Sequence, residues 1–225
     1  MKRILMIVLA AMPLLTTAQN RDWADYGRYA AANAQLTKAP EVVFMGNSIT
    51  DGWDDAHPEF FTDNNFACRG ISGQVSSQML CRFRADVINL HPRMVVILSG
   101  VNDLALNNGP IEMEHIVENI VSMAELARAA GIQPILCSPL PAGQFPWRPE
   151  IKGVAEQIRT LRDRLKAYAD EQQIPWVDYY SAMAADDGSM RSELTRDGVH
   201  PLREGYDIME RVIVPVIEAC RSAKR

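Results

Sequence analysis

The sequence predicts an α/β protein built on an open, doubly wound sheet. Apolar runs of four or five residues recur along the chain, and longer segments with a helical spacing of apolar residues lie between them. Continuous apolar runs are typical of strands buried on both faces of a parallel sheet. Strands that alternate with helices are joined by right-handed crossovers, which place helices on both faces. We therefore expect a mostly parallel sheet covered on each side.

Five segments fit the strand pattern. The clearest is 94–98 (MVVIL), which is fully apolar and rich in β-branched residues. The others are 41–45 (EVVFM), 65–69 (NFACR), 133–137 (QPILC) and 175–178 (PWVD). The first two of these end directly before a glycine, where the chain can turn sharply off the sheet.

Four segments show helical spacing. The first precedes all of the strands, and the other three alternate with the last three strands. They cover residues 22–34, 111–130, 151–173 and 204–220. Pro215 lies inside the last one. Because proline lacks a backbone donor and clashes with the preceding turn, we expect a kink or a break there.

The first 18 residues have the pattern of a secretory signal peptide. Lys2 and Arg3 precede an apolar stretch at 4–15, and small residues at 16–18 offer a cleavage site. The apolar stretch is short for a membrane span. We expect residues 19–225 to form a single domain that is exported to the periplasm or the medium without stable membrane insertion. The alternative is an uncleaved N-terminal anchor.

Charge and cysteine content exclude several classes of protein. The formal net charge is −5, and loss of the leader makes it −7. This mild acidity argues against nucleic acid or an anionic membrane as the main partner. The cysteines at positions 68, 81, 137 and 220 match no zinc-binding spacing. We interpret them as small buried hydrophobic residues rather than as disulfide partners.

Four short blocks carry residues suited to acyl transfer. They are 46–50 (GNSIT), Gly70, 100–103 (GVND) and 197–201 (DGVHP). The first three begin where a predicted strand ends, and the fourth precedes the last helix. Ligands of open α/β sheets bind beyond the carboxyl ends of the strands, so we expect the blocks to meet at one edge. Asp103 is interpreted as a structural residue that holds its loop.

The blocks supply a nucleophile, a base and oxyanion donors. Ser48 is the candidate nucleophile, and His200 is the base that takes its proton. Asp197, three residues earlier, can hold the other ring nitrogen and fix the tautomer. The developing oxyanion needs two or three donors, for which we expect the backbone N–H groups of Ser48 and Gly70 and the Asn102 amide. Each block alone also fits an ordinary turn or helix cap.

All four blocks in this order resemble those of the SGNH hydrolases, also called GDSL-type esterases and lipases. The resemblance runs from about residue 41 to the last helix. It implies a three-layer, flavodoxin-like α/β/α sandwich with a five-stranded sheet, no cofactor, no metal, and the same residue roles. The family often has Gly-Asp-Ser in the first block. Asn47 replaces that acid here, which affects the hydrogen bonding of the loop more than the reaction.

The stretch 44–53 is similar to a branch containing platelet-activating-factor acetylhydrolases and bacterial carbohydrate acetylesterases, which favours short acyl groups. The resemblance implies a serine esterase that removes a short acyl group, expected to be acetyl, from a glycan or a small-molecule ester. Alternatives are a lysophospholipase or thioesterase, an acyltransferase, and a glycan-binding protein with a decayed site. Trp53, Phe145 and Trp147 are candidates for lining the substrate cleft. Capping of the core is the equal alternative for these aromatic residues.

Overall fold

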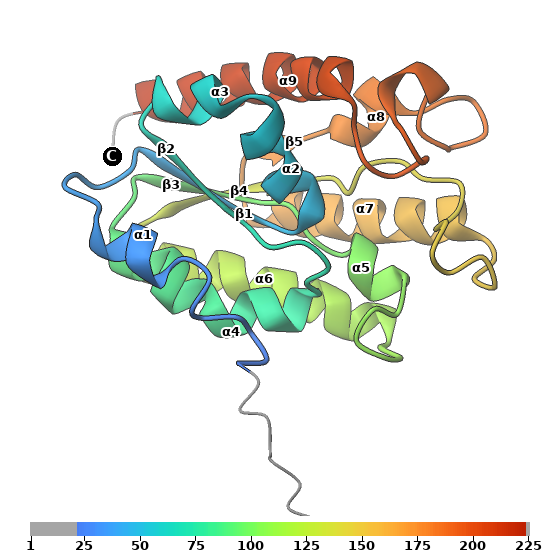
Figure 1. Ribbon diagram of the computed structural model, residues 1–225, viewed down its shortest axis with the longest axis horizontal. Coiled ribbons are helices and arrows are strands. Elements are labelled where there is room, and N and C mark those ends of the chain that lie inside the picture. Colours follow the sequence, from blue (N-terminus) through green and yellow to red (C-terminus); the bar gives the residue numbers. More distant parts are fainter. Residues whose placement is uncertain (1–21, 224–225) are drawn as a thin grey trace, which may run out of the picture.

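The computed structural model describes residues 22–223, so the predicted signal peptide at 1–18 lies outside the described residues. A five-stranded parallel sheet, in the order β2-β1-β3-β4-β5, forms the centre of the molecule (Figure 1). The strands are β1 (Val42–Gly46), β2 (Phe66–Gly70), β3 (Met94–Ile97), β4 (Gln133–Cys137) and β5 (Trp176–Val177). Their bounds differ from the predicted strands by at most one residue, so the α/β prediction is confirmed.

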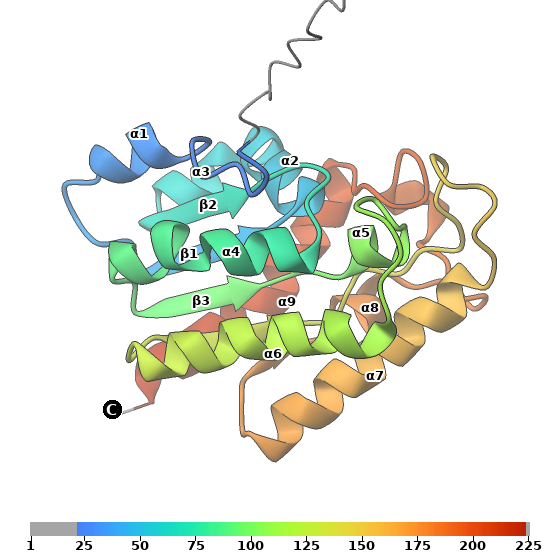
Figure 2. The ribbon, with the colours of Figure 1, turned by 90° about the horizontal axis from the view of Figure 1, so that it is seen from below.

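Helices cover both faces of the sheet. One layer contains α4 (Ser76–Asp86), α6 (Met113–Ala129) and α7 (Val154–Glu171), and the other contains α2 (Ser48–Ala56), α3 (Pro58–Thr62), α8 (Tyr179–Met183) and α9 (Arg203–Ser222). Figure 1 shows the sheet edge-on between these layers, and Figure 2 shows α4, α6 and α7 on the near side of the sheet. The remaining elements are α1 (Ala30–Ala34), α5 (Val101–Leu104) and the 3₁₀ turns Ile88–Leu90 and Ser192–Leu194.

The strands are buried on both faces, which explains their continuous apolar sequences. In β1, Val43 and Met45 join the core cluster under α4 and α6, whereas Val42 and Phe44 join the cluster under α2 and α9. Because side chains alternate along a strand, an apolar residue at every position serves two cores at once.

Two helix predictions are wrong in part. Of the segment 22–34, only Ala30–Ala34 is helical, and Asp25 before it has a left-handed φ of 55°. The other correction concerns Pro215, since α9 runs unbroken through it. Pro215 is exposed, as is Arg211, whose carbonyl loses its helical donor, so water can satisfy that group.

The cysteines are free thiols in the structure. Cys68 and Cys137 are buried, as expected, and burial raises the pKa of the Cys68 thiol to about 12. Cys81 is exposed and Cys220 is partly exposed, so the expectation of burial is wrong for these two. Within residues 22–223, no helix has the length and apolar character needed to cross a membrane.

Candidate active site

The turn from β1 into α2 places Ser48 at the carboxyl edge of the sheet. Gly46 must lack a side chain, because a Cβ there would lie 1.9 Å from Thr50 Oγ1. The Asn47 side chain then caps α2 by accepting from the backbone N–H of Ile49 at 3.4 Å. Ser48 is the first residue of α2, so its own N–H has no partner within the helix and is available to a ligand.

A chain of hydrogen bonds joins the three predicted catalytic side chains. Ser48 Oγ lies 2.9 Å from His200 Nε2, and His200 Nδ1 lies 2.7 Å from Asp197 Oδ2. The side chains of His200 and Asp197 are 28% and 29% exposed, so solvent and substrate can reach them. In this geometry the imidazole can take the serine proton while the carboxylate orients the ring.

The loop around His200 is held by its own short-range bonds. Asp197 Oδ1 accepts from the backbone N–H groups of Val199 and His200, at 3.0 and 2.8 Å. Thr195 Oγ1 donates to the His200 carbonyl and accepts from the N–H of Gly198, which has a φ of +86°. Burial raises the pKa of Asp197, but the hydrogen bonds from His200 and Val199 outweigh burial and leave it below its usual value.

A pocket of about 350 Å³ opens beside Ser48 and His200. Its lining includes Asn102, the predicted amide donor, whose Nδ2 atom donates to the Gln74 carbonyl at 2.9 Å. An amide nitrogen carries two hydrogens, so the second N–H of Asn102 is free for a substrate oxygen. The other residues of the lining are Ser48, Ser72, Gly73, Asn107, Trp147 and His200.

The structure does not bring Gly70 to this pocket, which corrects the predicted oxyanion donor. Gly70 is the last residue of β2, its carbonyl accepts from the Tyr29 hydroxyl, and a Cβ there would lie 2.2 Å from the backbone N of Asp51. Its lack of a side chain therefore permits close packing of β2 against α2. Gly73, three residues later, lines the pocket instead.

Gly73 occupies the tight turn 71–74, closed by a hydrogen bond from Gln74 N to Ile71 O at 3.3 Å. It is the third residue of that turn and has a φ of +81°, a conformation that favours glycine. The signal was present in the sequence as the second glycine of GISGQ, because a turn after the strand needs glycine at this position.

Two of the three predicted cleft aromatics belong to the core instead. Trp53 is 1% exposed, stacks on Phe60, and donates to Glu210 at 3.0 Å. Phe145 is fully buried. This agrees with the alternative of core capping, because each ring is buried in an apolar cluster and neither residue belongs to the pocket lining.

Trp147 is the aromatic residue that reaches the site. It is 38% exposed, its ring centroid lies 6.0 Å from that of His200, and its Nε1 donates to Asn107 Oδ1 at 2.9 Å. Sequence reasoning missed Asn107 and Ser72, because neither stands in a motif and only the fold brings them to the pocket.

Asp103 is buried and holds the start of α4. Its carboxylate accepts from the backbone N–H of Ser76 at 2.9 and 3.0 Å and from the Ser76 hydroxyl at 2.5 Å. Burial raises the pKa of Asp103 to about 6, although the bonds from Ser76 act in the opposite direction. Among residues 22–223, no group of three His, Cys, Asp or Glu side chains is arranged to hold a metal ion.

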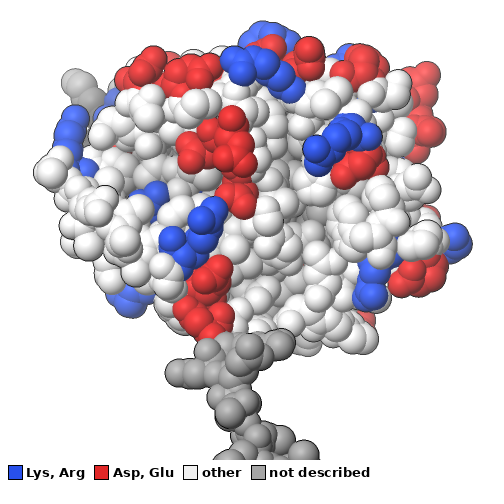
Figure 3. Space-filling view, in the orientation of Figure 1, with Lys and Arg blue, Asp and Glu red and all other residues white. Residues whose placement is uncertain are grey.

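Charged residues are distributed in small groups. On the face shown in Figure 3, the described Lys and Arg side chains are interspersed with Asp and Glu side chains. In the structure, Arg28 and Asp51 form an ion pair at 3.3 Å. Because charges of both signs alternate on this face, it does not form the extended basic surface that binds a polyanion.

The chain is similar to several known proteins. Residues 44–208, well over half of the chain, match the model of the GDSL-like lipase/acylhydrolase family. A crystal structure of a GDSL-like lipase from Bacteroides thetaiotaomicron is 49% identical in sequence, with a TM-score of 0.86, and the similarity covers 88% of this chain and 99% of that one.

Two further relatives are named for acetate esters. The isoamyl acetate-hydrolyzing esterase of Saccharomyces cerevisiae is 25% identical over 212 residues, which are 86% of this chain and 87% of that protein. An acetylxylan esterase from Geobacillus stearothermophilus has the same fold at 20% identity, with a TM-score of 0.62 over 80% of this chain and 94% of that one. The chain therefore belongs to the GDSL-like lipase/acylhydrolase family and is an enzyme of the esterase and acylhydrolase class.

Proposed function

We propose that this protein is a serine esterase that hydrolyses short-chain esters, chiefly acetyl esters of carbohydrates or similar alcohols. The observation that carries the proposal is the continuous hydrogen-bond chain from Ser48 through His200 to Asp197 beside the 350 Å³ pocket. Such a chain activates a hydroxyl that would otherwise be a weak nucleophile.

The reaction proceeds in two halves. Ser48 Oγ attacks the ester carbonyl and His200 takes its proton, which gives a tetrahedral intermediate. His200 returns the proton to the leaving alcohol as the C–O bond breaks, and an acyl-Ser48 remains. Water then attacks the acyl group, with His200 again as base, and the carboxylic acid and free Ser48 result.

The intermediate places a negative charge on the former carbonyl oxygen. We assign its stabilisation to the backbone N–H groups of Ser48 and Gly73 and to the free N–H of Asn102. Gly73 and Asn102 belong to the pocket lining together with Ser48, and the fold holds them in place before substrate arrives. Fixed donors aimed at a developing charge are usually the largest single contribution to catalysis.

Preference for a small acyl group and a polar alcohol is supported by the size and chemistry of the pocket. Ser72, Asn102 and Asn107 supply polar groups, and Trp147 supplies one exposed aromatic face. An aromatic face with nearby hydrogen-bonding groups suits a sugar ring. The names of two similar proteins, an isoamyl acetate-hydrolyzing esterase and an acetylxylan esterase, refer to acetyl esters, which agrees with this preference.

We also propose that the enzyme is exported after cleavage of residues 1–18. The support is the charged start, the apolar stretch and the small residues that follow it. Fractionation of cells that express the full chain, with mass analysis of the mature N-terminus, tests this. Recovery of the whole chain in the cytoplasm would contradict it.

The experiment that tests the function is a chain-length series. Hydrolysis of p-nitrophenyl acetate, butyrate and octanoate is measured for the mature protein and for Ser48→Ala. We expect the highest kcat/KM on acetate, and loss of that activity in the variant. Release of acetate from acetylated xylo-oligosaccharides, compared with lysophospholipid and acyl-thioester hydrolysis, then ranks the natural substrate classes.

Three outcomes would contradict parts of the proposal. Equal activity of Ser48→Ala and the wild-type protein would remove Ser48 as nucleophile. A preference for octanoate would favour a lipase over an acetylesterase. Formation of an acetylated sugar from p-nitrophenyl acetate and a free sugar acceptor would identify an acyltransferase, because a sugar hydroxyl would then replace water.

A further inference from the structure

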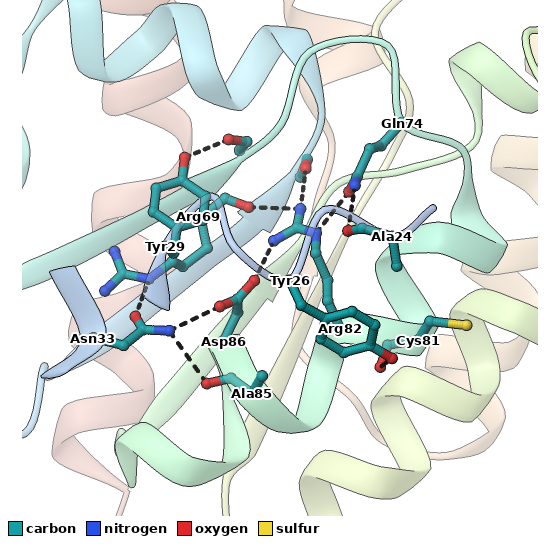
Figure 4. Close-up of polar contacts among 12 residues, drawn as sticks. Ala24, Tyr26, Tyr29, Asn33, Arg69, Gln74, Cys81, Arg82, Ala85 and Asp86 are labelled. Atoms are coloured by element: carbon teal, nitrogen blue, oxygen red, sulfur yellow. Dashed lines mark hydrogen bonds and ion pairs between the residues drawn. The ribbon is translucent and has the colours of Figure 1, made fainter. Parts of the chain in front are cut away.

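Gln74 belongs to a buried polar network around the Arg82 guanidinium (Figure 4). It lies next to the active site, because its carbonyl bonds to Asn102. It is 4% exposed and directly follows Gly73. Its side-chain oxygen accepts from Arg82 Nε at 2.6 Å, and its side-chain nitrogen donates to the Ala24 carbonyl at 2.8 Å. Its backbone carbonyl accepts from Asn102 Nδ2 at 2.9 Å. One residue therefore joins three distant segments of the chain.

Arg82 supplies the rigid side of this network. Its guanidinium is fully buried and bonds to the Asp86 carboxylate at 2.9 Å. Its Nη2 donates to the carbonyls of Gly46 and Arg69, which lie at the ends of β1 and β2. A buried guanidinium is stable only when its donors are paired, so Arg82 fixes the positions of its acceptors, including Gln74.

The segment before β1 supplies the other side. This segment, residues 22–36, lies beside α4, where Asn33 bonds to Asp86 at 2.8 Å and accepts from Arg69 Nε at 2.9 Å. The Ala24 carbonyl within it receives the Gln74 amide. The match to the family model begins at residue 44, so this anchor stands outside the matched region.

These contacts determine where the Asn102 amide points. One of its two N–H groups is bound to the Gln74 carbonyl, and the other has no hydrogen-bond partner among residues 22–223, at a residue that lines the pocket. The Gln74 carbonyl is held in turn because the side chain of the same residue is fixed from both ends. A shift of this carbonyl would turn the Asn102 amide away from the oxyanion, and misplacement of about 1 Å can cost ~100-fold in rate.

We propose that the Gln74 side chain is a positioning residue for the oxyanion hole, through which Arg82 and the segment before β1 orient the Asn102 amide. This inference rests on the proposed function. A positioning role differs from a purely structural role in its effect on catalysis. Loss of the Gln74 side-chain bonds is expected to weaken transition-state stabilisation, and to do so through Asn102.

The test is a double-mutant cycle with Gln74→Met and Asn102→Ala on p-nitrophenyl acetate. Methionine is close to glutamine in size, so it preserves packing while it removes both polar atoms. We expect Gln74→Met to lower kcat about 10–100-fold with KM changed less than about 2-fold, and Asn102→Ala to lower kcat about 10²–10³-fold. The double variant should be no more than about 3-fold slower than Asn102→Ala, because the first substitution acts through the second residue.

The Tyr26 hydroxyl also joins the segment before β1 to α4, by donating to the Cys81 carbonyl at 2.8 Å, but it bonds to none of Gln74, Arg82 and Asn102. Tyr26→Phe removes only this hydroxyl and is the matched control. We expect its kcat within about 2-fold of the wild-type value, whatever its effect on the melting temperature. If Gln74→Met is not recovered folded, Gln74→Glu carries the same cycle. Glutamate keeps an acceptor for Arg82 but cannot donate to Ala24.

The outcomes separate this inference from the proposed function. Unchanged kcat in the folded Gln74 variant, multiplicative losses in the double variant, or an equal loss in Tyr26→Phe would overturn the positioning role. In each of those cases an inactive Ser48→Ala would leave the serine esterase mechanism standing. Full activity of Ser48→Ala would instead remove the mechanism on which the inference depends.

Discussion

The two halves of the active site are constructed in different ways. The acid–base half lies within residues 195–201, where Asp197, His200 and Thr195 bond almost entirely to one another, and it is partly exposed. The oxyanion half joins Asn102 to Gln74 and, through it, to two further segments, and it is buried. The first half is thus specified by neighbours in the sequence, whereas the second exists only when the fold is complete.

The largest expected effect tests the local half. Asp197→Asn keeps the shape of the side chain but favours the wrong orientation of His200, so kcat should fall about 10³–10⁴-fold. Because the loop bonds are short-range, the free energy of unfolding should change little. Steady-state kinetics and urea unfolding measure the two effects. A large loss of stability with a small loss of kcat would reverse the proposed roles of the two halves.

The next effect separates Gly73, which lines the pocket in the oxyanion half, from Gly70, which packs β2 against α2. Gly70→Ala places a Cβ 2.2 Å from the backbone of Asp51 and should destabilise the protein by more than about 3 kcal/mol. The Cβ that Gly73→Ala adds has no atom within 4 Å. The left-handed φ of this residue should lower the free energy of unfolding of the variant by only about 1–2 kcal/mol. Thermal and urea unfolding compare them. Similar losses in both variants would show that the packing of β2 against α2 is not the constraint on Gly70.

A smaller effect, dependent on pH, tests the burial of Asp103 beside α4. Its folded-state pKa of about 6 lies above the usual 3.8. Its stabilising contribution is therefore complete below pH ~4 and is lost as the pH rises through about 6. Asp103→Asn lacks this titration, so the stability advantage of wild type over the variant should shrink by about 2 kcal/mol between pH 4 and 7.5. A difference that does not vary with pH would contradict this.

The smallest effect concerns Trp147. Its exposed ring beside His200 is expected to stack on the alcohol part of the substrate, a contact of about 1 kcal/mol. Trp147→Ala should raise KM about 3–10-fold on an acetylated sugar, with kcat little changed. Trp53→Phe is the control, because that buried ring should affect the melting temperature and leave KM unaltered. Equal KM values for Trp147→Ala and wild type would exclude the stacking role.

The sequence alone predicted the five strands, because residues buried on both faces of a sheet must be apolar at every position. It also predicted the Ser48, Asp197 and His200 group, which the structure joins by hydrogen bonds. The loop 195–201 is determined by contacts between residues at most five apart, and short-range patterns of that kind are visible in a sequence.

Only the tertiary structure decided the remaining features. Gly70 and Gly73 look equally suitable in the sequence, and the close approach of α2 to β2 distinguishes them. Trp53 and Trp147 have the same side chain, yet burial against α9 makes one a core residue while a loop leaves the other exposed. The bonds among Ala24, Gln74, Arg82 and Asn102 join residues up to 50 positions apart. Long-range burial and pairing of this kind leave no local pattern, because their energy depends on which segments meet in the folded chain.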